Sequence, residues 1–218
     1  MRTIPLLVTT LVLFISAPSF AQQWCELDWR EYENSIDSFG VSFPGEPTLE
    51  DIQFITSYQD TLPGRVYSYE VGPNGYSVTV VDYTGLEELE ARRVANCQEA
   101  GRDGDSCQNH YMHAIRGAVV YAIWNVVKRG GEVTYLSFSR TDLVEGQEMY
   151  VSNDDGSRTI AASYMHEDRL YILEATVPGD SPPPTLFYKS LRFLDENQQR
   201  IRYRTNYANG ITNPDRSR

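Results

Sequence analysis

Short segments in which apolar and polar residues alternate fill both halves of this chain. This pattern constrains the fold most, because alternation with a period of two puts successive side chains on opposite faces of a strand. We therefore expect strands at 39–43, 52–58, 65–71, 76–83, 132–140, 146–153, 158–166 and 169–177. The segment 76–83 carries apolar residues on both faces, which predicts a sheet covered on both sides.

Turn-forming residues separate the strands of the first half. Leu62-Pro63-Gly64 and Pro73-Asn74-Gly75 combine proline, glycine and asparagine, which suit tight reversals of the chain. We expect turns at both positions. Consecutive hairpins of this kind predict an antiparallel sheet.

Helical segments interrupt and follow the strands. Residues 85–97 are rich in glutamate and alanine, which favours a helix. From Tyr111 onward, apolar residues recur at helical spacing, although their β-branched content leaves a strand as the alternative. The buried face of this helix should contain Ala114, Ile115, Ala118, Val119, Ile123 and Val126. A last helix should begin after Ser181 and turn Phe187 and Leu191 inward.

These elements predict one domain of the α+β class, with a largely antiparallel sheet and helices packed on its faces. We place this domain at 39–204. It follows a lead-in at 22–38, which is either a short helix or irregular, and precedes a polar C-terminal tail at 205–218.

The first 21 residues have the features of a cleavable signal peptide. Arg2 gives a positive start, Leu6–Ile15 is mostly apolar, and Ser19-Phe20-Ala21 supplies the small residues that a signal peptidase reads. A chain with this leader is expected to be periplasmic or secreted. The longest later apolar run, Ala118–Trp124, is too short to span a bilayer.

Three cysteines follow the leader. Cys97 and Cys107 enclose a turn-rich loop with two glycines, and in an oxidising compartment this spacing predicts a disulfide between them. Cys25 remains, and it is either buried, free or paired with a second chain in a dimer.

The net charge of −11 argues against nucleic acid or an anionic membrane surface as a partner, because the chain would be repelled by both.

Two regions resemble a known family. The opening Phe39-Gly40-Val41-Ser42-Phe43-Pro44-Gly45-Glu46-Pro47 is similar to the start of small, uncharacterised bacterial exported domains. Arg169–Ala175 and Phe187–Leu191 are similar to the closing strand and helix of those domains. They resemble the PsbP-like α/β/α sandwich, over about residues 39–194. The resemblance implies an assembly or binding protein without an active site. The 97–107 insertion and the tail from Glu196 depart from that pattern.

The sequence offers few signs of catalysis. Cys107, His110 and His113 have a suggestive spacing, but residues six apart on a helix point in different directions, so we expect no metal site. No glycine-rich phosphate loop and no nucleophile elbow occur, so we expect no cofactor. The enzymatic alternative is a hydrolase or other enzyme built on His166 with Asp168 or Glu167.

Aromatic residues are the main candidates for binding. They comprise Tyr67, Tyr69, Tyr76 and Tyr83 around one hairpin, with Trp24 and Trp29 near the start of the mature chain. Such side chains combine a large contact area with a polar group, which suits a binding face. The alternative is that they pack between the sheet and its covering layers. The sequence thus predicts a non-enzymatic module that binds another envelope protein or a small ligand.

The signal peptide is directly testable. We expect cleavage after Ala21, so that the exported protein begins at Gln22. N-terminal sequencing and intact mass of protein extracted from the cell envelope measure this. A mass equal to that of the full chain would contradict export by this route.

Overall fold

The computed structural model of this protein describes residues 28–102 and 104–208. The expected signal peptide, Trp24 and Cys25 lie outside these residues. The described part is an α+β fold built mainly from antiparallel strands, as the sequence predicts. No helix among the described residues has both the length and the apolar character needed to cross a membrane.

A seven-stranded sheet forms the centre of the fold, in the order β3-β4-β5-β9-β8-β7-β6, and all neighbours are antiparallel. Its strands are β3 (Thr48–Ile55), β4 (Thr61–Val71), β5 (Asn74–Asp82), β6 (Glu132–Thr141), β7 (Val144–Ser152), β8 (Ser157–His166) and β9 (Arg169–Pro178). A smaller sheet, in the order β1-β2-β10, consists of β1 (Arg30–Asn34), β2 (Phe39–Phe43) and β10 (Arg192–Phe193).

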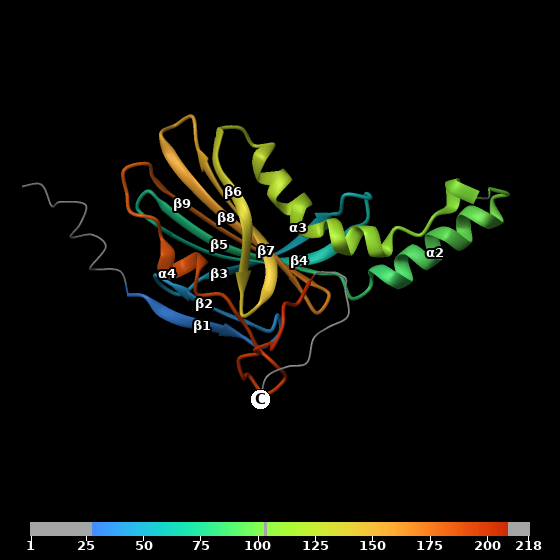
Figure 1. Cartoon of the computed structure of the whole chain (residues 1–218), viewed down its shortest axis with the longest axis horizontal. Coiled ribbons are helices and arrows are strands. Elements are labelled where there is room, and N and C mark those ends of the chain that lie inside the picture. Colours follow the sequence, from blue (N-terminus) through green and yellow to red (C-terminus); the bar gives the residue numbers. More distant parts are fainter. Residues whose placement is uncertain (1–27, 103, 209–218) are drawn as a thin grey trace, which may run out of the picture.

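Each face of the large sheet has its own cover (Figure 1). The small sheet and the short helix α4 (Thr185–Tyr188) pack on one face and enclose the largest apolar core. Helix α3 (Tyr111–Val127) packs on the other face over β7, β8 and β9. The expected cover on both sides is confirmed. In β5, the side chains of Tyr76 and Val78 enter the first core and that of Val81 lies on the α3 side, as does that of Tyr83 just after the strand.

A buried carboxylate links the small sheet to the large one. Asp37 lies between β1 and β2 and is almost fully buried. It accepts hydrogen bonds from the Arg65 guanidinium and from the Tyr67 hydroxyl of β4, and its backbone carbonyl accepts one from the Tyr171 hydroxyl at 2.7 Å. Burial is the main cause that raises the pKa of Tyr67, so this hydroxyl remains a neutral donor to Asp37.

Helix α3 agrees with its sequence pattern, and the strand alternative for this segment is wrong. All six residues predicted for its inner face are buried. Two glycines at 130 and 131, both with positive φ, follow the end of the helix and turn the chain into β6.

The structure corrects both expected turns of the first half. Residues 62–64 lie inside β4, and the chain reverses earlier, around Gln59, whose φ is 67°. The next hairpin turns at Gly72-Pro73, with Gly72 at φ 56°, while Asn74 and Gly75 already belong to β5. Glycine at the first central position is typical of a two-residue hairpin turn. Both expected turns were placed too far along the chain.

The ends of the domain also differ from expectation. The lead-in is not helical, because 30–34 forms β1 and pairs with β2. The helix expected after Ser181 is reduced to the single turn α4, and the chain passes into β10 at Arg192. At the other end, Tyr207 is buried and bridges to Val144, so the packed domain extends past residue 204.

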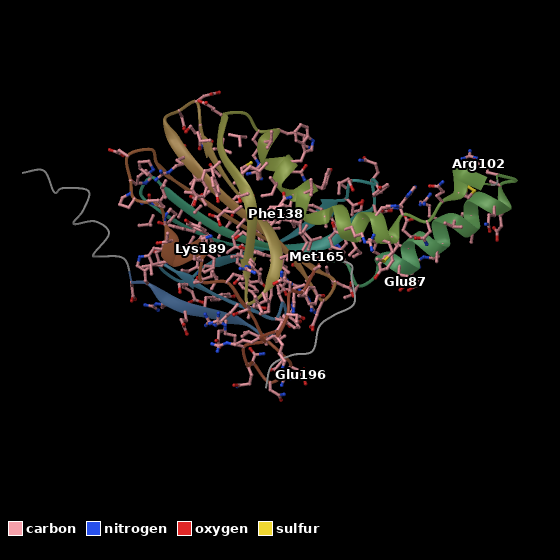
Figure 2. The ribbon with its side chains drawn as sticks, viewed as in Figure 1. Glu87, Arg102, Phe138, Met165, Lys189 and Glu196 are labelled. Atoms are coloured by element: carbon pink, nitrogen blue, oxygen red, sulfur yellow. A yellow bond between two sulfur atoms is a disulfide. The ribbon has the colours of Figure 1, made fainter. Side chains whose placement is uncertain are left out.

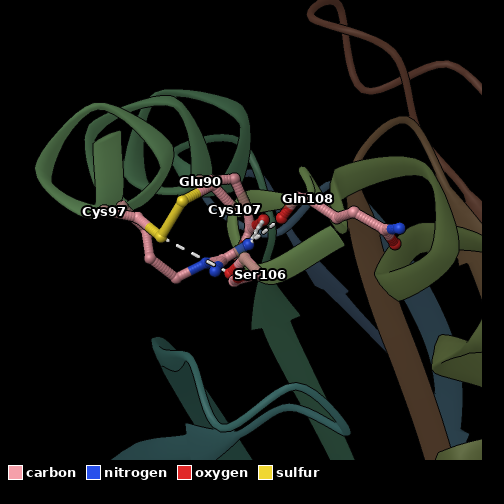
Figure 3. The surroundings of a disulfide bond; sticks show 6 residues. Glu90, Cys97, Ser106, Cys107 and Gln108 are labelled. Atoms are coloured by element: carbon pink, nitrogen blue, oxygen red, sulfur yellow. Dashed lines mark hydrogen bonds and ion pairs between the residues drawn. A yellow bond between two sulfur atoms is a disulfide. The ribbon is translucent and has the colours of Figure 1, made fainter. Parts of the chain in front are cut away.

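Helix α2 (Leu86–Glu99) projects from the body together with the 3-10 turn η1 (Gly104–Cys107) (Figure 1). We call 86–107 the arm. Cys97 and Cys107 form the predicted disulfide, with Cα atoms 5.7 Å apart (Figure 3). The disulfide links α2 to the end of η1 within the arm. Near the base, the buried carboxylate of Glu90 accepts hydrogen bonds from Arg93 at 2.9 and 2.8 Å. Those bonds are the main cause that lowers the pKa of Glu90.

The packing of α3 can be tested with two adjacent residues. Val119 is buried against the sheet, whereas Val120 is 53% exposed. Val119→Asp should lower the free energy of unfolding by about 3–5 kcal/mol, because it buries a charge without a partner. Val120→Asp is the control and should change it by about 0.5 kcal/mol or less. Equal melting temperatures for the two variants, measured by circular dichroism, would contradict the assigned helix face.

Candidate protein interface at the edge of the sheet

Strand β6, at one end of the large sheet, exposes apolar side chains. Within the part of the chain that the structure describes, β6 pairs with β7 alone, so its outer edge has no neighbouring strand. Phe138 is 87% exposed and Leu136 is 57% exposed. Figure 2 shows Phe138 on β6. An apolar edge strand of this kind is a ready template for pairing with another chain.

The register of β6 tells which face these side chains occupy. Leu136 lies opposite Met149 of β7, and Met149 packs with Ile123 and Val126 of α3. Residues opposite one another in antiparallel strands share a face of the sheet. Leu136 therefore lies on the α3 face, and so does Phe138, two residues further along.

Helix α3 adds one apolar residue on the side of the same edge. Val120, which is 53% exposed, lies one helical turn before Ile123, whose side chain packs with Met149 of β7. Trp124 lies two residues from the buried Ala122 and Val126, which places it on the outer side of the helix, away from the sheet. The connection from α3 to β6 spans only residues 128–131, which keeps the end of the helix close to the start of the strand (Figure 1). We define the β6–α3 surface as the four exposed apolar residues Val120, Val133, Leu136 and Phe138.

A pocket of about 450 Å³ opens beside Phe138. Its other lining residues are Ser139, Arg140, Glu145 and Asn206. Its charged lining residues are the base Arg140 and the acid Glu145. Apolar area with a polar rim is typical of protein contact sites.

The opposite edge of the same sheet is different. Strand β3 also has exposed apolar residues, Leu49 and Ile55, but acidic Glu50 and Asp51 lie between them. Charges within an edge strand discourage pairing with another chain. Residues 133–139 of β6 carry no charged side chain. The two edges therefore differ in their capacity to pair.

Beneath β6, on the face opposite α3, lies a polar cluster that sequence reasoning missed. Tyr150 donates a hydrogen bond to the buried Glu148 carboxylate at 2.8 Å, and its hydroxyl lies 3.1 Å from that of Tyr188. Lys189 forms an ion pair with Glu148. Burial is the main cause that raises the pKa of Tyr150, which favours its neutral form. The Tyr135 ring lies 4.9 Å from that of Tyr150. The polar groups of this cluster are paired with one another through these hydrogen bonds and this ion pair.

The structure corrects the tyrosine part of the predicted binding face. Tyr67, Tyr76 and Tyr83 are buried, so in this fold they offer no surface to a partner. They pack in the cores because the hairpin that carries them lies inside the sheet. Tyr69 and Trp29 are half-buried, and the Trp29 ring contacts Tyr76 edge-on at 5.7 Å.

The histidine of the enzymatic alternative is part of the core. His166 is buried, its ring stacks on Phe193 at 4.2 Å, and its Nε2 lies 2.7 Å from the Tyr203 hydroxyl. Tyr207 packs on it as well. The His166 ring is therefore enclosed by three aromatic side chains. Burial raises the pKa of the neighbouring Asp168.

His110 is half-buried, and its ring stacks on that of Tyr58 at 4.5 Å. Among the described residues, no three or more His, Cys, Asp or Glu side chains are grouped closely enough to hold a metal ion.

Comparison with known proteins gave no family: no family model matches the chain, and no similar curated protein was found. The argument for function therefore depends on the site itself.

The sequence of β6 contains a pattern that relates to this surface, but the pattern alone does not show that the residues are exposed. Val133, Tyr135, Leu136 and Phe138 place apolar groups on both faces of one strand. That pattern is typical of a strand inside a sheet. It occurs here on an edge strand, and only the strand order shows that the groups are exposed.

If the β6–α3 surface serves contact rather than folding, its removal should leave the domain stable. In dilute solution, where any such contact is dissociated, Phe138→Asp should shift the melting temperature by no more than a degree or two, because the ring is exposed. Phe187→Ala, in the core, should cost about 3–5 kcal/mol. Thermal unfolding of both variants measures this. A large loss of stability in Phe138→Asp would mean that Phe138 supports the fold.

Proposed function

We propose that this chain is an exported, non-enzymatic assembly module that associates with another protein through the β6–α3 surface. The observation that carries the proposal is the exposed apolar area on an unpaired edge strand. Monomeric proteins seldom expose contiguous apolar area unless it makes contacts. Association would remove Phe138 and Leu136 from water and would satisfy the outer backbone groups of β6.

Export of the chain to the periplasm or beyond is part of the same proposal. The Cys97–Cys107 disulfide is compatible with an oxidising environment, and the sequence of residues 1–21 supports export to the periplasm or beyond. The motifs at 39–47, 169–175 and 187–191 support a PsbP-like sandwich, whose relatives serve mainly in assembly. The buried His166 gives the enzymatic alternative no comparable support.

A photoreactive phenylalanine analogue at position 138 tests the proposal in living cells. We expect illumination to give one discrete crosslinked species, because the analogue would lie within the contact. Leu136→Asp in the same chain should abolish that species, since a charge would be placed in the apolar contact.

The same analogue at Leu49 is the matched control. This residue is 56% exposed on the opposite edge strand, β3, so collisions with abundant proteins should reach both positions equally. Equal crosslinking from positions 49 and 138, or none from position 138, would contradict a specific contact at β6.

A further inference from the structure

We infer that the partner on the β6–α3 surface is a second copy of this chain, joined by antiparallel pairing of β6 with β6 across a two-fold axis. The inference rests on the proposed function, because it names the occupant of that contact site. Two seven-stranded sheets would then form one continuous sheet. A two-fold contact uses the same patch on both partners, so the patch must be complementary to itself. Strand β6 meets this requirement in its backbone, its side chains and its charges.

The outer edge of β6 has backbone N–H and C=O groups that could form hydrogen bonds with an antiparallel strand. The two-residue turn Asp142-Leu143 joins β6 to β7, and Thr141 and Val144 close the hairpin. Hydrogen-bonded and non-hydrogen-bonded pairs alternate from there. The N–H and C=O groups of Leu136, Phe138 and Arg140 therefore point away from β7, toward a neighbouring strand. The irregularity in the register lies at 133–135, which leaves 135–141 regular.

The side chains complement one another under the same symmetry. A two-fold axis perpendicular to the sheet keeps the α3 face on the same side in both copies. With the axis between Leu136 and Phe138, each Leu136 meets the Phe138 ring of the other copy. The exposed Val120 of each α3 helix lies on the same side of the joined sheet as this contact. The apolar residues of both copies would form a single cluster.

The charges of β6 favour the antiparallel arrangement. The chain has a net charge of −11, yet β6 is uncharged from 133 to 139 and carries only Glu132 near its start and Arg140 near its end. With the axis between Leu136 and Phe138, antiparallel pairing places Arg140 of one copy opposite residue 134 of the other, which is uncharged, so no like charges of β6 face each other. Parallel pairing would put like charges together, which is destabilising. Strand β3, with Glu50 and Asp51 in its first half, lacks this property.

The apolar side chains on β6 supply part of the area that a specific dimer buries. A buried aromatic side chain covers about 150–250 Å². At 87% exposure, Phe138 offers roughly 130–220 Å² per copy. Leu136, Val120, Val133 and the strand backbone add to this, toward the roughly 800 Å² per partner of a standard interface.

Sedimentation equilibrium of the purified exported protein under reducing conditions, which exclude a Cys25 link, tests the inference. We expect a dimer for the unmodified chain and for Leu49→Lys, the control on β3. Phe138→Lys should be a folded monomer, with its dissociation constant raised at least 100-fold, because a charge would lie at the centre of the contact. A dimer that persists unchanged in Phe138→Lys would overturn the inference.

The outcome for an unmodified monomer separates the two proposals. If the pure protein stays monomeric while position 138 still crosslinks to a different protein in cells, the second copy is wrong and the contact surface stands. If the protein is monomeric and position 138 gives no crosslink, both proposals fail.

A cysteine placed near the axis tests the geometry. In a Cys25→Ser background, Ser137→Cys should form a disulfide-linked dimer on mild oxidation, because opposite Cα atoms in antiparallel strands are about 4.5–5.5 Å apart. Asp51→Cys on β3 is the control and should stay monomeric. If both cysteines link at the same rate, the links come from random collision and antiparallel pairing at β6 is refuted.

Discussion

The fold depends on covering both faces of a seven-stranded sheet with one short chain. Strands β8 and β9 are buried along most of their length, so each face above them needs a packed layer. On one face that layer is the single helix α3. A helix is about 10 Å across and strands are about 4.8 Å apart, so one helix covers two or three strands. Helix α3 covers β7, β8 and β9, and the cover ends before β6. The exposed apolar edge is a consequence of this geometry.

Local patterns explain how much of the fold could be predicted. The β-forming composition of 158–166 and 169–177, each bounded by turn residues, and the helical period in 111–127 are properties of the segments themselves. The turns were harder, because Gly72-Pro73 and Asn74-Gly75 both suit a hairpin, and the choice depends on the register between β4 and β5. Residues 62–64 contain proline and glycine, yet pairing with β3 holds them in a strand.

The candidate site could not be predicted for a related reason. Tyr67 and Phe138 both lie in strands of similar composition, and nothing nearby in sequence shows that one is central and the other at an edge. Strand order is a property of the whole chain. The disulfide between Cys97 and Cys107 was accessible to sequence reasoning, because it depends on a short loop and on the compartment. The projection of the arm from the body could not be predicted from the sequence, since it depends on how α3 packs on the sheet (Figure 1).

Hydrogen exchange at the backbone amides of Leu136 and Phe138 tests most directly whether β6 is a contact strand. These N–H groups point away from β7 and have no strand beyond them within the described residues. Our account predicts rapid exchange in dilute protein and strong protection in concentrated protein, while the outer amides of β3 exchange rapidly in both. Rapid exchange at Leu136 and Phe138 at every concentration, matching that of β3, would contradict it.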